Sequence, residues 1–204
     1  MPCDQDACNT KAEQEQLAEY DVELVKLLVR LEHEIFMHCL RTHDLAQAIG
    51  SALGLSSPEL FRLKMGALLH DVGKHDAPGP EHPRRGWEYV SSIPGLSTGI
   101  KNIVLHHHRW ADGTGGYPQD PEEERPCFLT QIVSVADTID RCLVRQVSLE
   151  DCLAFLDSGS GTQFNQYIVK AVKNISTELA ELMTSYAEYQ TQAAIGHNIP
   201  SRGR

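Results

Sequence analysis

The stretch from Leu60 to Lys74 reads Leu-Phe-Arg-Leu-Lys-Met-Gly-Ala-Leu-Leu-His-Asp-Val-Gly-Lys, an apolar helical pattern that ends in a His-Asp pair. Ser57-Pro58-Glu59 precedes it and is a helix start, with Ser as cap and Pro at the first helical position. At a helix end, adjacent His and Asp side chains can converge on one or two metal ions, to which imidazole supplies nitrogen and the carboxylate can bridge. Gly73 permits a tight turn that brings Lys74 back towards the same point.

Helical periodicity continues on both sides of this stretch. Further helices are expected over residues 11–31, 36–53, 83–91, 97–107 and 128–143, from Ser148 onward, and over 163–189. The segment 109–124 is rich in Gly and Pro and predicts an irregular loop. The sequence therefore predicts an all-α fold, a single domain of about seven or eight helices. We expect a flexible N-terminus over 1–12, the domain with its leading helix over 13–190, and a flexible tail over 191–204.

Composition excludes several classes of function. The 204 residues are 41% hydrophobic and 23% charged, with a formal net charge of -10. So acidic a chain is unsuited to non-specific DNA binding or to anionic membranes, because both need a basic surface. The first residues resemble no signal peptide, and no apolar run is long enough to span a bilayer. We therefore expect a cytoplasmic protein, whose six scattered cysteines are free thiols.

Histidine is the unusual residue: nine of the ten histidines lie between His33 and His108. The triplet His106-His107-His108 ends a helical stretch, and the alternative to a metal site there is a solvated helix end beside the negative pole of the helix dipole. Asp137 interrupts an apolar helix, where it needs either a metal or a core histidine as partner. The remaining histidines divide into one ambiguous residue, His82, and four with a structural or exposed interpretation, His33, His43, His75 and His197.

Glu34 and His38 are four residues apart and share one helical face, which suits either two metal ligands or an ordinary surface pair. Together these elements supply enough nitrogen and oxygen ligands, on separate helices, for a di- or trinuclear centre of borderline or hard metals. No element contributes a thiolate, so a structural zinc–cysteine site is disfavoured.

In chain order, these motifs resemble the signatures of the HD-GYP family, a branch of the HD phosphohydrolase superfamily. The matching segments are His38 with Arg41, His70 to Lys74, His82 to Gly86, His106-His107 with Asp112-Gly113 and Gly116-Tyr117-Pro118, Val135 to Asp140, and Gly161 to Phe164. The resemblance covers about residues 34–172. Proteins of that family are helical, bind two or three iron or manganese ions, and hydrolyse cyclic di-GMP.

The resemblance implies a set of site residues. The implied metal ligands are Glu34, His38, His70, Asp71, His82, His106, His107 and Asp137. Asp71 would bridge two metals, Glu34 would serve a third, and Lys74 would hold a phosphate oxygen. Gly113, Tyr117 and Arg145 are the expected substrate contacts. The expected reaction is attack on phosphorus by a hydroxide bound between the metals, with the developing charge offset by the metals and Lys74.

The chain departs from the family pattern around the substrate. Only seven residues separate Lys74 from His82, Ala111 and an extra glycine lengthen the next loop, and the segment after Asp140 is shortened. His108 stands where the family has Glu, so an alternative register makes His107 and His108 the ligand pair.

The sequence thus predicts a metal-dependent phosphodiesterase acting on cyclic di-GMP or a related cyclic dinucleotide or other phosphate ester. Two alternatives stay open. One is an HD-type nucleotide phosphohydrolase or di-iron oxygenase with a smaller substrate, and the other is a signalling module that binds a cyclic dinucleotide without turnover. The leucine spacing from Leu17 to Leu31 suits packing on the same domain or a homodimer seam, and a regulatory protein partner is a further expectation.

Overall fold

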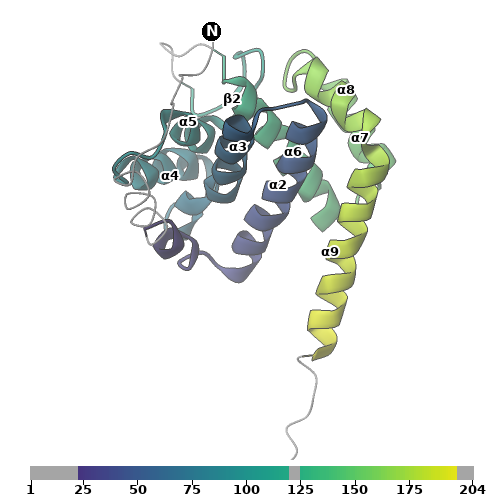
Figure 1. Ribbon diagram of the computed structural model, residues 1–204, viewed down its shortest axis with the longest axis horizontal. Helices are drawn as coiled ribbons and strands as arrows, with labels where there is room; N and C mark the ends of the chain where they lie inside the picture. The colour runs from purple at the N-terminus through teal and green to yellow at the C-terminus, as the bar shows by residue number, and fades with distance from the viewer. Residues whose placement is uncertain (1–22, 120–124, 197–204) are drawn as a thin grey trace, which may run out of the picture.

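The computed structural model describes residues 23–119 and 125–196, and within these ranges the chain is all-α, as predicted (Figure 1). Residues 23–28 are helical. The elements that follow are α2 (His33–Ala52), α3 (Ser57–Leu69), the 3₁₀ helices η1 (Val72–His75) and η2 (Gly79–Glu81), α4 (His82–Ser91), α5 (Thr98–His106), β1 (His108–Arg109), β2 (Gly116–Tyr117), α6 (Phe128–Val144), α7 (Leu149–Ser158), α8 (Gln166–Asn174) and α9 (Ser176–Gly196).

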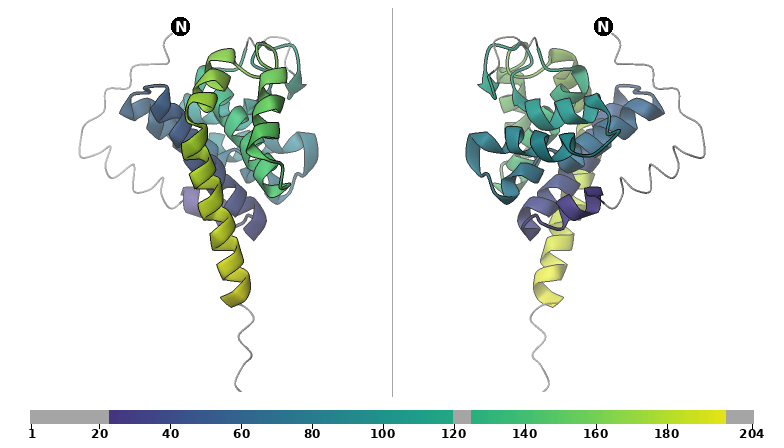
Figure 2. Two further views of the ribbon diagram at one scale, coloured as in Figure 1. Left: turned by 90° about the vertical axis from the view of Figure 1, so that its right-hand side faces the viewer. Right: turned by 90° about the vertical axis from the view of Figure 1, so that its left-hand side faces the viewer.

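Three helices form the centre of the domain: α2 packs against both α3 and α6. Helix α5 lies against α3 and α4, while α9 contacts α2 and then projects beyond the other helices (Figure 2). One buried apolar cluster joins α2, α3 and α6 to α7, α8 and α9 through residues such as Ile49, Ile132 and Val172. A second cluster, with Leu69 and Val104, covers α3, α4 and α5. The helix ends that carry the polar motifs are thus fixed by apolar packing on both sides.

Local sequence explains where α3 begins. Ser56 is the N-cap, one residue before the predicted cap, and its backbone N–H donates to the Glu59 carboxylate at 2.9 Å. The Ser56 hydroxyl donates to the same carboxylate at 2.6 Å. This capping box satisfies donors that a helix start leaves unpaired. It sets the register of the helix that ends at His70.

The structure corrects two expectations. The predicted helix over 163–189 is divided into α8 and α9, because Ile175 leaves the helical backbone conformation (φ -106°, ψ 21°) between Asn174 and Ser176, neither of which is a strong helix former. Helix α9 also continues through residues 191–196, which were assigned to the tail. The two-residue strand β1 begins one residue before the loop predicted over 109–124 and pairs with β2 inside it; residues 120–124 lie outside the described ranges.

The leading segment packs on its own domain where it is described. Leu24 and Leu31 are buried in the second apolar cluster, while Leu17 lies outside the described residues, as do Cys3, Cys8 and His197. Cys39, Cys127, Cys142 and Cys152 are free thiols, as predicted. None of the helices in the described part of the chain is both long and apolar enough to cross a membrane.

Candidate metal centre

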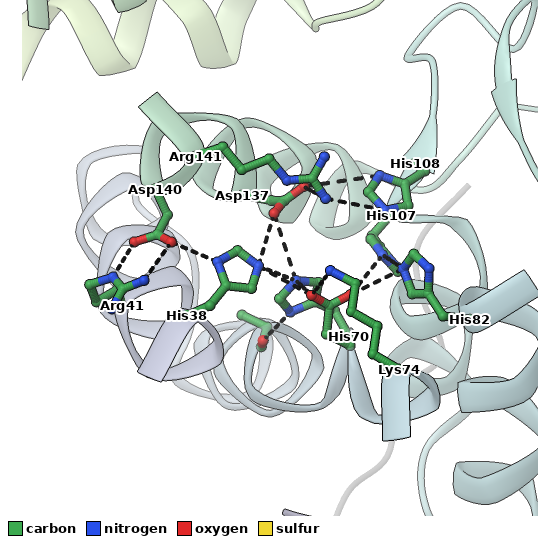
Figure 3. A network of polar contacts seen from close by, with 12 residues as sticks. His38, Arg41, His70, Lys74, His82, His107, His108, Asp137, Asp140 and Arg141 are labelled. Atoms are coloured by element: carbon green, nitrogen blue, oxygen red, sulfur yellow. Dashed lines mark hydrogen bonds and ion pairs between the residues drawn. The ribbon is translucent and has the colours of Figure 1, made fainter. Parts of the chain in front are cut away.

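Three helix ends and two helix interiors bring the predicted motifs to one place (Figure 3). His38 comes from α2, His70 and Asp71 follow α3, His82 begins α4, His107 and His108 follow α5, and Asp137 comes from the buried face of α6. The side chains form two groups of possible metal ligands, and within each group the ligand atoms all lie within 4.8 Å of one another. One group consists of Asp71, His82, His107 and His108, and the other of His38, His70 and Asp71. Asp71 belongs to both groups, and its role as a bridging carboxylate stays a prediction.

Gly73 makes the approach of η1 to α4 possible. A Cβ at this position would lie 2.0 Å from the His82 carbonyl oxygen and 2.5 Å from the Gly86 nitrogen, so only glycine fits. The close contact places His82 next to Asp71, with Nε2 of His82 3.0 Å from Oδ1 of Asp71. The Lys74 ammonium also returns to the site, as predicted, and lies 2.5 Å from Oδ2 of Asp71.

Four histidines point the same ring nitrogen into the centre, because the other nitrogen is engaged elsewhere. Nδ1 donates to a carbonyl in His70 (Ala67, 2.7 Å), His82 (Gly79, 2.5 Å) and His107 (Val104, 2.9 Å). In His38, Nδ1 donates to the Asp140 carboxylate at 2.6 Å. A neutral imidazole has one N–H, so in the neutral form of each ring these bonds leave the lone pair on Nε2. This is the tautomer that metal-ligating histidines adopt.

The inward nitrogens face one another in pairs. Nε2 of His38 lies 3.1 Å from Nε2 of His70, and Nε2 of His82 lies 3.2 Å from Nε2 of His107. When both rings of a pair are neutral, their lone pairs repel each other at such distances, and a proton or a metal ion shared between them removes the repulsion. The donor set therefore fits metal ions better than it fits a network of neutral side chains.

The carboxylates carry the complementary charge. Oδ1 of Asp71 and Oδ1 of Asp137 are buried and face histidine ring nitrogens, Nε2 of His82 at 3.0 Å and Nε2 of His38 at 3.1 Å. Burial would raise the pKa of Asp71, but His70, His38 and His82 outweigh it and hold that pKa well below its ordinary value. Two ionised carboxylates in a buried site favour a cation.

The pKa values of the histidines fall into two classes: that of His38 is raised, and those of His107 and His108 are lowered. Burial would lower the pKa of His38, but contacts with Asp137, Asp140 and Asp71 raise it to about 11. Burial, reinforced by neighbouring histidines, lowers the pKa of His107 well below 6.5, and burial lowers the pKa of His108 to about 3. His107 and His108 are therefore neutral at pH 7, while His38 holds a proton among three carboxylates. A metal ion at His38 would exchange with that proton.

The buried ion pair between Arg41 and Asp140 contacts the side of the His38 ring that faces away from the metal centre. Arg41 donates from Nε to Oδ1 of Asp140 at 2.5 Å and from Nη2 to Oδ2 at 3.1 Å. Both side chains are almost fully buried, at 2% and 0% exposure. The pair orients the Asp140 carboxylate, which in turn orients the His38 ring (Figure 3).

The geometry favours the alternative register for the histidine triplet. His106 is buried as the last residue of α5 but contributes no atom to either ligand group. His107 is the C-cap, and the chain then enters β1, so that the rings of His107 and His108 lie 4.1 Å apart, both beside His82. The prediction of His106 as a ligand is not supported, because helix α5 ends one residue before the two rings that face the site.

The predicted substrate contacts lie around the centre at different depths. Tyr117 is partly buried, with its ring 4.6 Å from the His108 ring. Gly113 (φ +81°) belongs to the preceding turn, where its N–H donates to Trp110. Glu34 and Arg145 are exposed and line a cavity of about 330 Å³ next to His38, and Glu34 belongs to neither ligand group.

The chain segment that carries Tyr117 is anchored by backbone bonds. Ala111 and Asp112 donate their N–H groups to the carbonyls of Gln163 and Thr162, both at 3.0 Å. Gly116 has φ +80°, and a Cβ there would lie 1.9 Å from the His108 carbonyl oxygen. The added Ala111 is thus absorbed in a contact with residues 162–163 while β1 and β2 stay paired.

Two residues of the site were missed as functional residues. Asp140 was quoted only as part of a motif, although its position three residues after Asp137 on one helix face was a usable signal. Arg141 was missed although it follows Asp137 by four residues, a spacing that suits an ion pair; its Nη2 lies 3.1 Å from Oδ2 of Asp137 and 3.4 Å from Nε2 of His108.

Comparisons with known proteins identify the family of the chain. The sequence profile of the HD domain family matches residues 35–142, and the chain belongs to this family. It is 27% identical to a cyclic di-GMP phosphodiesterase of Thermotoga maritima, with 84% of this chain and 55% of the relative covered. It is 29% identical to the cyclic di-GMP phosphodiesterase PA4108 of Pseudomonas aeruginosa, with 55% and 32% covered. The chain thus spans about half of the first relative's length and about a third of the second's.

Solved structures share the fold. Bd1817, an HDGYP protein from Bdellovibrio bacteriovorus, superposes with a TM-score of 0.62 at 21% identity, over 80% of this chain and 64% of Bd1817. The HD domain of the phosphodiesterase PgpH from Listeria monocytogenes, in complex with cyclic di-AMP, gives a TM-score of 0.54 at 15% identity, over 89% and 99% of the two chains. The resemblance to HD-GYP proteins found in the sequence is confirmed.

Proposed function

We propose that the protein is a metal-dependent phosphodiesterase that hydrolyses cyclic di-GMP or a related cyclic dinucleotide. The observation that carries the proposal is the sharing of Asp71 between two groups of metal-ligating atoms. Two adjacent metal sites joined by a carboxylate are the arrangement used for in-line displacement at phosphorus. The names of the relatives and of the PgpH complex support the substrate class.

The proposed ligands are the residues whose lone pairs or carboxylates face the centre: His38, His70, Asp71, His82, His107, His108 and Asp137. Their mixture of imidazole and carboxylate suits iron or manganese, two ions per chain. When bound, such ions lower the pKa of a coordinated water so that hydroxide is available near neutral pH. Glu34, on the cavity wall one helical turn before His38, is the proposed ligand of a third ion.

The chain's own residues have separate proposed roles. The Lys74 ammonium, 24% exposed beside Asp71, binds an oxygen of the reacting phosphate and stabilises its developing charge. Asp71, buried and ionised, orients the ions and the phosphate relative to each other. Tyr117 and Gly113 form the wall beside His108 on which the rest of the substrate lies.

We further propose a cytoplasmic location and action as a homodimer or with a regulatory partner. The four described cysteines are unpaired, which suits a reducing compartment. The net charge of -10 supports a small phosphate ester rather than DNA or a membrane surface as the binding partner.

The test is anaerobic purification, metal analysis, and incubation of the iron- or manganese-loaded protein with cyclic di-GMP. We expect hydrolysis, and its loss in Asp71→Asn, an isosteric change that keeps the fold. Hydrolysis of mononucleotides alone would instead support a nucleotide phosphohydrolase. Tight binding of the dinucleotide without product would make the protein a signalling module. Two ions in both the wild type and Glu34→Gln would remove the role proposed for Glu34.

A further inference from the structure

The two-stranded ribbon of β1 and β2 turns one face to the metal centre. His108 pairs with Tyr117, and Arg109 pairs with Gly116. Side chains of directly paired residues lie on the same face of a ribbon, and the rings of His108 and Tyr117 are 4.6 Å apart. The Tyr117 ring also lies 6.2 Å from the His82 ring. This face of the ribbon therefore borders the proposed ligands.

Trp110 extends the same face by one pair. Its N–H donates to the Gly115 carbonyl at 3.0 Å, which continues the pairing of the two strands beyond Arg109 and Gly116. Because side chains alternate along a strand, Trp110 shares the face of His108, two residues away and about 7 Å along the ribbon. Arg109 between them belongs to the opposite face and is buried. The ribbon thus presents an indole next to the proposed ligand His108.

Gly115 lies directly beneath the indole of Trp110. A Cβ at Gly115 would lie 2.4 Å from Cδ2 of Trp110, 2.6 Å from Cε3 and 2.7 Å from Cε2. Cδ2 and Cε2 form the bond shared by the two rings of the indole, so the backbone approaches the face of the ring system and not its edge. Glycine permits this close contact. One face of the indole therefore rests on the backbone, while 37% of Trp110 stays exposed.

A flat aromatic ring that is supported on one face and exposed elsewhere suits stacking with a planar ligand. With the reacting phosphate at the metal centre, the base of the same nucleotide lies one ribose away, and Trp110 lies one residue pair beyond His108. We propose that Trp110 is the stacking platform for one nucleobase of the cyclic dinucleotide. This inference rests on the proposed function and assigns its recognition of the base. Every base has a π-face, so the platform accepts guanine and adenine alike.

Steady-state kinetics of the metal-loaded protein test the platform. Trp110→Ala should raise KM for cyclic di-GMP about tenfold while kcat changes less than about twofold, because stacking acts on the bound base and not on the reacting phosphate. Trp110→Phe keeps a flat ring and should recover most of the loss. The matched control is Trp87→Ala, which removes a tryptophan of the same 37% exposure from α4. Equal KM values for Trp110→Ala and Trp87→Ala overturn the proposal.

Inhibition constants separate base stacking from a structural effect on the metal centre. Trp110→Ala should raise the inhibition constant of GMP and leave that of inorganic phosphate, which has no base, unchanged. Gly115→Ala adds a Cβ that displaces the indole, so it should have the same effect. An equal rise for GMP and phosphate, or a loss of metal from Trp110→Ala, would show that Trp110 acts through the centre and would overturn the proposal.

Fluorescence distinguishes this inference from the proposed function. The chain has two tryptophans, so Trp110 is the only one in Trp87→Phe. Rapid mixing of manganese-loaded Trp87→Phe with cyclic di-GMP should quench its emission before turnover, whereas inorganic phosphate should not. Turnover with neither quenching nor an effect of Trp110→Ala leaves the phosphodiesterase standing and removes the platform. Quenching without turnover by any metal-loaded form retains the platform and removes the phosphodiesterase.

Discussion

Nδ1 of His38 lies 2.6 Å from Oδ2 of Asp140, and this contact fixes which nitrogen of His38 faces the metal centre. The Asp140 carboxylate is itself held by Arg41, so two residues, Arg41 from α2 and Asp140 from α6, orient the His38 ring. The orientation of His38, a proposed metal ligand, therefore depends on how α2 packs against α6.

Asp140→Asn should weaken metal binding about 10- to 100-fold without unfolding the protein, because the amide keeps the shape but loses the charge that strengthens His38 as a donor. Metal titration by competition with a chelator measures the change. Asp157→Asn, which alters an exposed carboxylate paired with Lys173, is the control and should bind metal as the wild type does.

Arg41→Met should destabilise the metal-free protein by about 3–5 kcal/mol, because it leaves Asp140 buried without its cation. Urea denaturation measures the free energy of unfolding. The double variant Arg41→Met/Asp140→Leu removes both charges and should recover part of the loss. If the single variant is as stable as the wild type, the buried pair does not have this role.

His107→Ala should lower the metal content, whereas His106→Ala should leave the number of ions per chain unchanged. The reason is geometric: His107 presents Nε2 to His82, and His106 contributes no atom to either ligand group. Metal analysis of the two purified variants is the measurement. The opposite result would restore the first register of the histidine triplet.

Gly73→Ala should reduce metal content and destabilise the fold together. The added Cβ would overlap the His82 carbonyl, and relief of the overlap moves α4 and its first residue away from Asp71. Gly79→Ala is a useful contrast, since no atom lies within 4 Å of a Cβ there, although φ +81° strains that residue. We expect metal loss in the first variant and full metal content in the second.

The metal-free protein should be most stable near pH 6.5. The pKa of His38 is raised to about 11, so its contribution is complete below the unfolded value of 6.5 and is lost as pH rises towards 11. The pKa values of His107 and His108 are lowered, so their contributions are present above 6.5 and are lost as pH falls. Urea denaturation in EDTA from pH 5 to 9 measures this. A monotonic rise in stability over that range would contradict the charge state assigned to His38.

The sequence was sufficient for the fold class and for most of the centre, because helix periodicity and terminal motifs are local properties. The end of α3 at His70 and the return of Lys74 are examples. Which two histidines of the triplet face the site could not be predicted from the local sequence, because this depends on where α5 ends relative to α4. The contact of Arg141 with His108 was not local either, because it forms only when α6 meets β1; its pairing with Asp137, four residues earlier on the same helix, could have been predicted.

The backbone bonds from Ala111 and Asp112 to residues 162–163 hold the segment before Tyr117, the proposed wall beside His108, without using any side chain of the metal centre. Backbone bonds place few demands on side-chain identity, whereas each proposed ligand demands one residue type. The two parts of the molecule are therefore free to diverge at different rates. Exchange of segments 109–117 and 161–164 between related chains would be a direct route to altered substrate preference on an unchanged catalytic platform.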